Sequence, residues 1–489
     1  MKSADEYTIK HLSISSYDLM EKASAAFVKC FMKDNPDTEK HIIIFCGNGN
    51  NGGDGFAIAR LLYNQDYLKI KVYKINFSAS AFTEDFVKNQ EALRTTGMKP
   101  IELNTADEIN DIEADIIIDA ILGSGLNKPL AEEYEKLVQK INHSNKIIYS
   151  VDIPTGMFAE GAFLPEYNGI KAYKTISFQR PKLNFFFPES IAATRLYETV
   201  DIGLIEEYIQ SLHTDYHQTE LKDIKKIIKP RERFSHKGTF GHALIVAGNK
   251  ETMGAALLNS MGCLYAGAGL TSVGIPADGL TALNSSVPEA MYVAREKITS
   301  HDYLAKYSAI AVGSGLGESD EAKQMLAHLL QSVKPLVIDA DALNILAKNK
   351  EIMAQLPVNT ILTPHMKEFD RMFGEHENWW SRLQTARQQT SEKQIIILLK
   401  SQYTFICTPD KQVYINTTGN AAMAQGGMGD VLTGIIVSFL AQGYTPVESA
   451  IMGCYLHGKS GDTIAVNKIV ATASEVARQI AIEMKSISF

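Results

Sequence analysis

The sequence predicts an α/β protein of two three-layer α/β/α domains, each with a mainly parallel sheet between layers of helices. Three observations support this fold class. Short apolar runs alternate with amphipathic segments along the chain, as they do in parallel sheets. The 489 residues are too many for one ordinary domain. Apolar residues make up 45% of the chain, which is enough to fill two cores.

Composition narrows the function classes. The net charge is −8, and no block of basic residues with interleaved aromatics occurs, which argues against nucleic acid as a partner. No apolar run approaches the roughly 18 residues of a membrane span, and Met1–Glu6 lacks a signal-peptide core. The five cysteines are scattered and are expected to be reduced. We therefore expect a cytoplasmic protein that acts on small molecules, with no nucleic-acid or membrane partner.

The amino-terminal half begins with a predicted helix over residues 11–32, in which Ser15 and Asp18 resemble a capping box. A buried parallel strand is predicted at residues 41–46. A glycine-rich and asparagine-rich loop at 46–55 follows, and a helix begins near Phe56. A strand, a glycine loop and a helix in this order form a phosphate cradle.

Gly47, Gly49 and Gly52 satisfy the pattern G-x-G-x-x-G, but a dehydrogenase is not favoured. The next predicted strand, at 70–75, ends in Asn76 and offers no acidic residue for a ribose hydroxyl. The asparagines of the glycine loop instead supply oxygen acceptors for a hard cation or a polar ring.

Two further strands, predicted at 115–119 and 146–151, end in Asp119 and Asp152. Ligands of open α/β sheets bind at the carboxyl edge of the strands, so both aspartates are candidates for a site there. The alternative is that both are helix caps. Lys182 is a further candidate for the rim, and its alternative is a solvated surface lysine.

Residues 206–235 are polar and interrupt the α/β alternation, so we place a domain boundary near residue 215, giving domains at 1–215 and 216–489. His213 and His217 are four residues apart, but no third metal ligand and no H-E-x-x-H glutamate accompany them, so a metal site is not favoured.

The carboxy-terminal half repeats the α/β alternation. Its predicted strands lie at 242–247, 270–275, 309–312, 336–339, 394–399, 403–407 and 412–415. The short runs after 394 predict an antiparallel extension of a parallel sheet. A P-loop string at Gly453–Ser460 is rejected, because Thr445 and Glu448 form a capping box that places residues 446–457 in a helix.

The segment Gly426–Asp430 ends where a buried helix begins. The first N–H groups of a helix lack partners and carry partial positive charge, and glycines let an anion approach them. A carboxylate beside an anion site is useful if it takes a proton from an attacking hydroxyl. The alternative is a glycine turn with Asp430 as the helix N-cap. The pattern resembles the catalytic G-x-G-D of ribokinase-like kinases, in which the aspartate is the base.

Other polar residues fall at predicted strand ends of this half. Glu368 follows His365 by three residues, like the N-x-x-E of ribokinase-like kinases, whose glutamate orders water around Mg²⁺. The alternatives are an exposed glutamate at a helix start and a structural histidine. Lys400 ends a strand and is placed to meet nucleotide phosphates, or it is a plain surface lysine.

The whole amino-terminal half resembles the NAD(P)H-hydrate epimerases. The resemblance rests on GNGNNGGDG at 47–55, DAILGSG at 119–125, VDIPTG at 151–156 and LMEKA at 19–23. It implies a Rossmann-like fold, with Asp152 as the acid/base. It also implies a potassium site made by Asn51, Asp119 and Thr155. The residues implied to line the substrate site, besides Asp152, are Asn50, Asn51, Gly52, Gly53, Asp54, Gly123, Ser124, Gly125, Leu126, Asn127, Lys128 and Pro129.

The carboxy-terminal half resembles the ADP-dependent NAD(P)H-hydrate dehydratases, which are ribokinase-like. The strings are HKGTFGHALIVAG, YAGAGLTSVGIP, VGSGLG, VIDADALN, LTPHMKEF and NAAMAQGGMGDVLTG. The resemblance implies that the hydrated cofactor contacts Ala255, Gly315, His365 and Asp430. It implies that the nucleotide contacts Lys400, Ser401, Gln402, Tyr403, Thr404 and Gly429. Two departures from the usual family pattern are Ser401 in place of glycine and Ala421 in place of proline.

Both resemblances imply repair of NAD(P)H hydrated at C6 of the nicotinamide ring. The first domain would interconvert the R and S epimers with K⁺ as cofactor, and the second would dehydrate the S epimer with Mg²⁺ and ADP as phosphoryl donor. We also expect a homo-oligomer. Two other classes stay open at this point: a ribokinase-like small-molecule kinase with an accessory domain, and a non-catalytic binding protein. The sequence does not separate ADP from ATP or the NADH hydrate from the NADPH hydrate.

Overall fold

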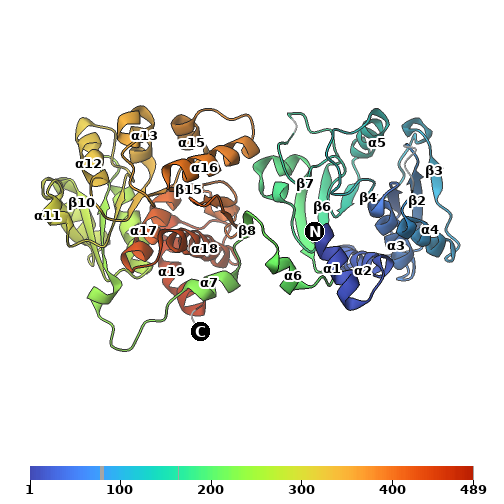
Figure 1. The fold of residues 1–489 in the computed structure, drawn as a ribbon, viewed down its shortest axis with the longest axis horizontal. Helices are drawn as coiled ribbons and strands as arrows, with labels where there is room; N and C mark the ends of the chain where they lie inside the picture. Colours follow the sequence, from blue (N-terminus) through green and yellow to red (C-terminus); the bar gives the residue numbers. More distant parts are fainter. Residues whose placement is uncertain (78–81, 164, 488–489) are drawn as a thin grey trace. The chain divides into compact units, whose positions relative to one another are not determined.

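The computed structural model describes residues 1–77, 82–163 and 165–487 (Figure 1). They form two units, residues 1–213 with 378–380, and residues 214–377 with 381–489, the latter described to 487. Each unit is an α/β structure around one sheet, which confirms the predicted fold class. Within the described ranges, no helix has both the length and the apolar character that a membrane span requires.

The first unit contains a sheet of seven parallel strands in the order β3-β2-β1-β4-β5-β6-β7. Its strands are β1 (Ile42–Cys46), β2 (Ile70–Ile75), β3 (Ile101–Leu103), β4 (Ile116–Ala120), β5 (Ile147–Val151), β6 (Ala172–Phe178) and β7 (Thr194–Val200). Its helices are α1 (Lys2–Leu12), α2 (Ser16–Asp34), α3 (Asn50–Tyr63), α4 (Glu84–Arg94), α5 (Glu132–His143) and α6 (Glu206–Ser211).

Strand β1 shows why this unit has three layers. Side chains alternate across a strand, so Ile42 and Ile44 enter the core that contains α2, α3 and α4. Ile43 and Phe45 enter a second core on the other face, which contains α5. A fully apolar strand between two helical layers is therefore consistent with the sequence of β1.

The predicted helix over 11–32 is wrong at its start. Two helices, α1 and α2, are separated at Ser13, which has a left-handed φ of 52°. The predicted capping box explains the break, because the hydroxyl of Ser15 accepts from the backbone N–H of Asp18 at 3.1 Å and begins a new helix.

The second unit contains ten strands in the order β11-β10-β9-β12-β13-β14-β15-β16-β17-β8. The strands are β8 (Tyr216–Gln218), β9 (His242–Val246), β10 (Leu270–Ile275), β11 (Met291–Ala294), β12 (Ala309–Val312), β13 (Leu336–Ile338), β14 (Ile361–Leu362), β15 (Ile396–Leu399), β16 (Thr404–Cys407) and β17 (Val413–Asn416). The strands β15, β16 and β17 pair antiparallel and confirm the predicted extension.

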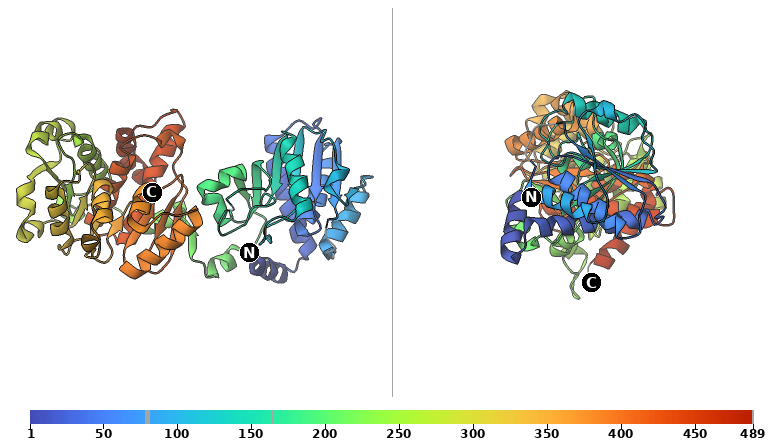
Figure 2. Two further views of the ribbon diagram at one scale, coloured as in Figure 1. Left: turned by 90° about the horizontal axis from the view of Figure 1, so that it is seen from above. Right: turned by 90° about the vertical axis from the view of Figure 1, so that its right-hand side faces the viewer.

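The helices of the second unit pack on its sheet, with α12, α13 and α15 on one side and α17, α18 and α19 on the other (Figure 1). They are α7 (Leu221–Ile227), α8 (Met253–Tyr265), α9 (Leu280–Ser286), α10 (Arg295–Ile298), α11 (His301–Leu304), α12 (Asp320–Leu330), α13 (Ala340–Lys348), α14 (Lys350–Met353), α15 (Met366–Phe373), α16 (Trp379–Lys393), α17 (Met428–Ala441), α18 (Pro446–Ala465) and α19 (Ala473–Ile487). Figure 2 gives two further views of the layers.

The polar segment near residue 215 is more ordered than the sequence predicts. Tyr216–Gln218 form β8, which pairs with the edge strand β17, and the Nε2 atom of His217 lies 2.9 Å from the Oε1 atom of Gln412. The edge strand offers unpaired backbone groups, which even a short polar strand can satisfy. The rejected P-loop string lies in α18, capped by Thr445 and Glu448 as predicted.

Helix α17, which carries Asp430, packs closely on α8. A Cβ atom on Gly434 would lie 2.0 Å from the carbonyl oxygen of Asn259, so only glycine allows this approach.

We expect Gly434→Ala to destabilise the second unit by about 1–3 kcal/mol, because the new methyl group overlaps backbone atoms and forces α8 and α17 apart. The measurement is the midpoint of urea unfolding. Gly254→Ala, in α8, is the matched control, since a Cβ atom there has no neighbour within 4 Å. Equal stability of the two variants would contradict this account of the helix contact.

Candidate active sites

The first candidate site lies where the strand order of the first sheet reverses. Strands β1 and β4 are neighbours there, and the loops that follow them leave in opposite directions, which opens a crevice at their carboxyl ends. Helix α3 already begins at Asn50, so residues 50–54 form its first turns and not a loop, which corrects the predicted extent of the glycine loop. A Cβ atom on Gly52 would lie 1.9 Å from the carbonyl oxygen of Gly47, which explains this tight start.

Asp119 is fully buried at the end of β4. Its carboxylate accepts from the hydroxyl of Ser150 at 2.8 Å and from the backbone N–H and hydroxyl of Thr155 at 2.9 and 2.7 Å. A longer bond comes from the backbone N–H of Ile121. Burial raises the pKa of Asp119, and these hydrogen bonds offset that effect only in part. The structure thus brings Asp119 and Thr155 together, and no cationic side chain of the described part of the chain pairs with the Asp119 carboxylate.

Asn51 lies beside the loop that follows β4. Its side-chain amide nitrogen is buried without a hydrogen-bond partner, and a Cβ atom on Gly123 would lie 3.4 Å from the Cβ atom of Asn51. The backbone N–H of Leu122, next to Gly123, donates to the Thr155 hydroxyl at 3.0 Å. Asn51 therefore adjoins the Asp119 and Thr155 pair through this loop. Residues 124–129 of the same loop are mostly exposed.

Asp152 follows β5 with a left-handed φ of 64°, a costly conformation for a residue other than glycine that recurs at functional sites. Its Oδ1 atom accepts from the Lys182 ammonium at 2.6 Å, from the backbone N–H of Phe178 at 3.0 Å and from the Ser177 hydroxyl at 3.3 Å. Among the described residues, Oδ2 has no hydrogen-bond partner. Lys182 is therefore no solvated surface lysine. It orients a carboxylate that keeps one oxygen available.

Asp54, on α3, is a second carboxyl group near Asp152. Burial raises the pKa of Asp54 well above its ordinary value, the negative charge of Asp152 raises it further, and a hydrogen bond from Ser24 lowers it. Burial therefore favours the neutral form of Asp54, while the Asp152 carboxylate is paired with the Lys182 ammonium. Two neighbouring carboxyl groups in such different environments are suited to general acid–base chemistry.

The second candidate site surrounds Asp430. Gly427, with a φ of 89°, precedes the helix as its N-cap, and Asp430 is the third residue of α17. Asp430 is therefore not the N-cap, which excludes the alternative taken from the sequence. Its carboxylate makes a hydrogen bond with Ser314, which precedes Gly315. Gly315 packs against α8, because a Cβ atom on it would lie 3.0 Å from the Cβ atom of Ala255.

The charges around Asp430 favour its protonated form. Burial is the main cause, and the negative charge of Asp339 adds to it, so that the pKa of Asp430 is raised to about 7. The Ser314 hydrogen bond and the positive charge of Lys400 lower the pKa and limit the shift. A carboxyl group with a pKa near the working pH is well matched to accept a proton in catalysis.

His365 and Lys400 stand side by side at the ends of β14 and β15, where they form a parallel bridge. The Nδ1 atom of His365 accepts from the backbone N–H groups of Lys367 and Glu368 at the start of α15. The carboxylate of Glu368 in turn accepts from the His365 backbone N–H at 2.9 Å and is buried. Glu368 is thus not an exposed glutamate. It completes a capping box that fixes the His365 ring.

A pocket of about 330 Å³ adjoins Asp430 at the start of α17. Five of the residues predicted to contact a nucleotide line it: Lys400, Ser401, Gln402, Thr404 and Gly429. Tyr403 is not among the lining residues. The lining also includes Asn416, Thr418 and His457.

Sequence reasoning missed His457 because it lies inside the P-loop string that the helix prediction rejected. Burial lowers the pKa of His457 to about 4, with a further contribution from Lys400, so the ring is neutral. Helical spacing would have identified it, since Cys454, His457 and Gly458 are three and four residues apart on one face of α18 and all line the pocket.

Comparisons with known proteins agree with this division into two sites. A family model described as YjeF-related protein N-terminus matches residues 16–184, and one described as NAD(P)H-hydrate dehydratase matches residues 243–482. A bifunctional NAD(P)H-hydrate repair enzyme of Moorella thermoacetica is 33% identical, over 95% of this chain and 91% of its own length. The Escherichia coli enzyme of that name is 31% identical, over 93% and 86%.

A solved structure is similar to the second unit. It is an ADP/ATP-dependent NAD(P)H-hydrate dehydratase from Bacillus subtilis, co-crystallised with ATP and Mg²⁺. It is 31% identical in sequence, covers 55% of this chain and 97% of its own, and has a TM-score of 0.50.

We expect the carboxyl group of Asp430 to titrate near pH 7, against an ordinary value of 3.8. The measurement is ¹³C NMR of aspartate-labelled protein, with Asp430→Asn to assign the resonance. Lys400→Met should raise the pKa further, because the ammonium group that lowers it is removed. A resonance that titrates near the ordinary value would show that the site is more hydrated than the geometry implies.

Proposed function

The chain belongs to the family of bifunctional NAD(P)H-hydrate repair enzymes, and we propose that each unit carries one of the two repair activities. Residues 1–215 form the epimerase domain, which interconverts the R and S epimers of hydrated NAD(P)H. Residues 216–489 form the dehydratase domain, which converts the S epimer back to NAD(P)H at the expense of ADP or ATP. Cytoplasmic location and a homo-oligomeric state stay predictions.

In the epimerase domain Asp152 is the acid/base. The observation that supports this role is its strained backbone together with the Lys182 contact, which leaves Oδ2 available to the substrate. Asp152 moves a proton at the C6 centre or at its hydroxyl group. The substrate lies in the crevice between residues 50–54 of α3 and residues 123–129 of the loop after β4.

Asn51, Asp119 and Thr155 fit a potassium ion. The described residues contain no cluster of three or more His, Cys, Asp or Glu side chains that would hold a transition metal. Potassium instead takes neutral oxygen ligands beside a carboxylate, and here the Asp119 carboxylate is buried with neutral donors only. A bound cation would supply the missing positive charge and help to position the substrate phosphates.

In the dehydratase domain the nicotinamide ring lies among Ala255, Gly315, His365 and Asp430. The nucleotide occupies the pocket lined by Lys400 and Gly429, with its terminal phosphate at the start of α17 and Mg²⁺ bound to its phosphates. The observation that carries this assignment is the position of Asp430 next to both proposed sites. Its carboxylate is hydrogen-bonded to Ser314, which precedes Gly315 of the ring site, and its chain neighbour Gly429 lines the nucleotide pocket.

The chemistry follows from this placement. Asp430 takes the proton of the C6 hydroxyl group, whose oxygen forms a bond to the terminal phosphorus of ADP as AMP leaves. The C6–O bond then breaks with loss of phosphate and of a proton from C5, which restores the C5–C6 double bond. Phosphorylation is needed because hydroxide is a poor leaving group and phosphate is a good one. A small-molecule kinase would stop at the phosphorylated product and release no phosphate.

Substitution of the two aspartates should separate the activities. Asp430→Asn is expected to lower dehydration by about 100-fold or more while epimerisation persists, because the base is lost. Asp152→Ala should do the reverse and leave dehydration of the pure S epimer intact. Each is measured by recovery of the dihydronicotinamide absorbance, by phosphate release, and by chromatography of the epimers. Near-full dehydration in Asp430→Asn would refute the assignment of the base.

Potassium should stabilise the epimerase domain specifically. Replacing choline chloride with KCl at constant ionic strength is expected to raise its thermal midpoint and its epimerisation rate, because the cation offsets the buried Asp119 charge. Thr155→Val removes one oxygen ligand and should abolish the response, whereas Thr95→Val, which removes an exposed hydrogen bond to the backbone oxygen of Ala92, serves as the control. An equal response in all three proteins would point to a general salt effect.

A further inference from the structure

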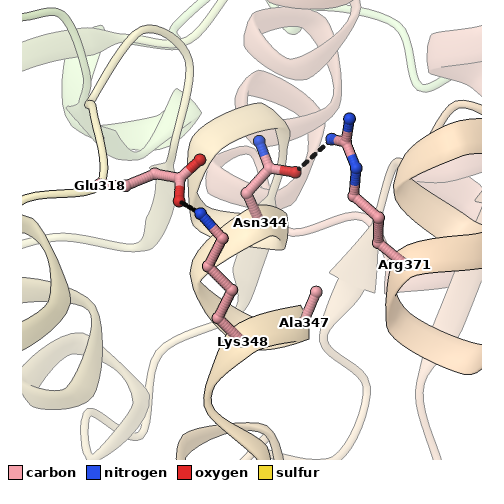
Figure 3. Close-up of a pocket in the computed structure, with 5 residues that line it drawn as sticks. All are labelled: Glu318, Asn344, Ala347, Lys348 and Arg371. Carbon is pink, nitrogen blue, oxygen red and sulfur yellow. Dashed lines mark hydrogen bonds and ion pairs between the residues drawn. The ribbon is translucent and has the colours of Figure 1, made fainter.

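A second cavity of about 460 Å³ lies in the dehydratase domain, apart from the nucleotide pocket (Figure 3). It is lined by Glu318, Asn344, Ala347, Lys348 and Arg371. These residues come from the segments that follow β12, β13 and β14, which are neighbours in the sheet. The helices that carry Asn344, Lys348 and Arg371 begin at the carboxyl edge of the strands, where ligands of such sheets bind, and the cavity lies along these helices.

The two cations of this cavity are held differently. The Lys348 ammonium is paired with the carboxylate of Glu318. The Arg371 guanidinium donates to the side-chain oxygen of Asn344 at 2.9 Å and, among the residues that the structure describes, forms no ion pair. A neutral amide orients the guanidinium without neutralising it. Arg371 therefore keeps its full charge and further N–H donors in a geometry suited to a phosphate.

The cavity is built on the same loop and helices as the reaction centre. Glu318 lies three residues beyond Gly315, and the backbone N–H of Gly317 donates to Asp341 at 2.8 Å, which ties this loop to α13. Arg371 lies on α15, the helix that His365 caps, and the positive charge of Arg371 contributes to the lowered pKa of His365. The same loop and helices thus present one group of residues to the nicotinamide ring and another to the cavity.

The proposed substrate is larger than the site around its nicotinamide ring and needs a second binding region for its other half. Hydrated NAD(P)H is a dinucleotide, and the four residues around its nicotinamide ring leave its adenosine half unassigned. The ADP pocket is already filled by the phosphoryl donor. We propose, on the premise of the proposed function, that the Arg371 cavity binds a phosphate group of the adenosine half of hydrated NAD(P)H. In this subsite Arg371 makes the main contact with the phosphate, and Asn344 positions the guanidinium group. Glu318 pairs with Lys348 and so keeps that ammonium group from the phosphate.

The test compares Arg371→Gln with the wild-type full-length protein on three S-hydrates: those of NADH, NADPH and reduced nicotinamide mononucleotide, which lacks the adenosine half. The KM for a dinucleotide hydrate should rise about tenfold, the typical effect of losing a charged hydrogen bond, with kcat kept. The KM for the mononucleotide hydrate and for ADP should not change. Lys323→Gln, which removes an exposed charge of α12 outside the cavity, is the matched control.

Comparison of the NADH and NADPH hydrates also identifies which phosphate group Arg371 binds. A rise in KM limited to the NADPH hydrate assigns Arg371 to the 2′-phosphate, and an equal rise for both dinucleotides assigns it to the pyrophosphate. Glu318→Gln should act in the opposite direction and lower the KM for the same substrate, because Lys348 loses its carboxylate partner and becomes available to phosphate.

Two results would overturn the subsite. One is an unchanged KM for both dinucleotides in Arg371→Gln, and the other is an equal loss on the mononucleotide hydrate, which would mean that the variant disturbs the ring site. An unchanged KM for ADP and an unchanged thermal midpoint show that the variant is folded. If the wild-type protein dehydrated none of the three substrates, the proposed function itself would fail, which is distinguishable from failure of the subsite.

Discussion

The buried carboxylate of Asp339, at the end of β13, holds the dehydratase site together. It accepts from the Thr363 hydroxyl at 2.6 Å, the Thr433 hydroxyl at 2.9 Å and the Lys400 ammonium at 3.1 Å. These partners come from the end of β14, from α17 and from the end of β15, so one side chain fixes three elements around the pocket. Its negative charge also contributes to the raised pKa of Asp430. A buried charge of this kind is costly unless its partners satisfy it fully, which makes the arrangement rigid.

The epimerase domain also contains a buried carboxylate at a strand end, but the groups that bond to it are different. Asp119 occupies the corresponding kind of position, at the end of an inner strand, and is equally buried. Its partners are hydroxyl and backbone N–H groups, and within the described ranges no lysine pairs with it. Asp339 pairs with the ammonium of Lys400, whereas the described residues place no cationic side chain on Asp119. This difference is the physical basis of the potassium site that we propose for the epimerase domain.

In both domains a second carboxylate does the proposed chemistry beside the structural one. Asp152 and Asp430 each lie at the carboxyl edge of a sheet, beside backbone in an unusual conformation. Asp152 itself has a left-handed φ, and a glycine N-cap with a left-handed φ precedes Asp430. Lys182 pairs with Asp152 and orients its carboxylate, while burial raises the pKa of Asp430 to about 7. The two domains therefore prepare their acid/base groups by opposite electrostatic means.

The sequence by itself determined what depends on local pattern. Apolar runs such as that of β1, the capping boxes at Ser15 and Thr445, and the glycines before α17 specify strands, helix starts and tight turns through neighbouring residues alone. Only the tertiary structure decided what depends on partners remote in the chain. Lys182 meets Asp152 across 30 residues and Lys400 meets Asp339 across 61, and neither distance has a local signal. The raised pKa of Asp430 and the unpaired charge of Arg371 likewise arise from burial and from charges on other strands and helices, because electrostatic interactions act through space and not along the sequence.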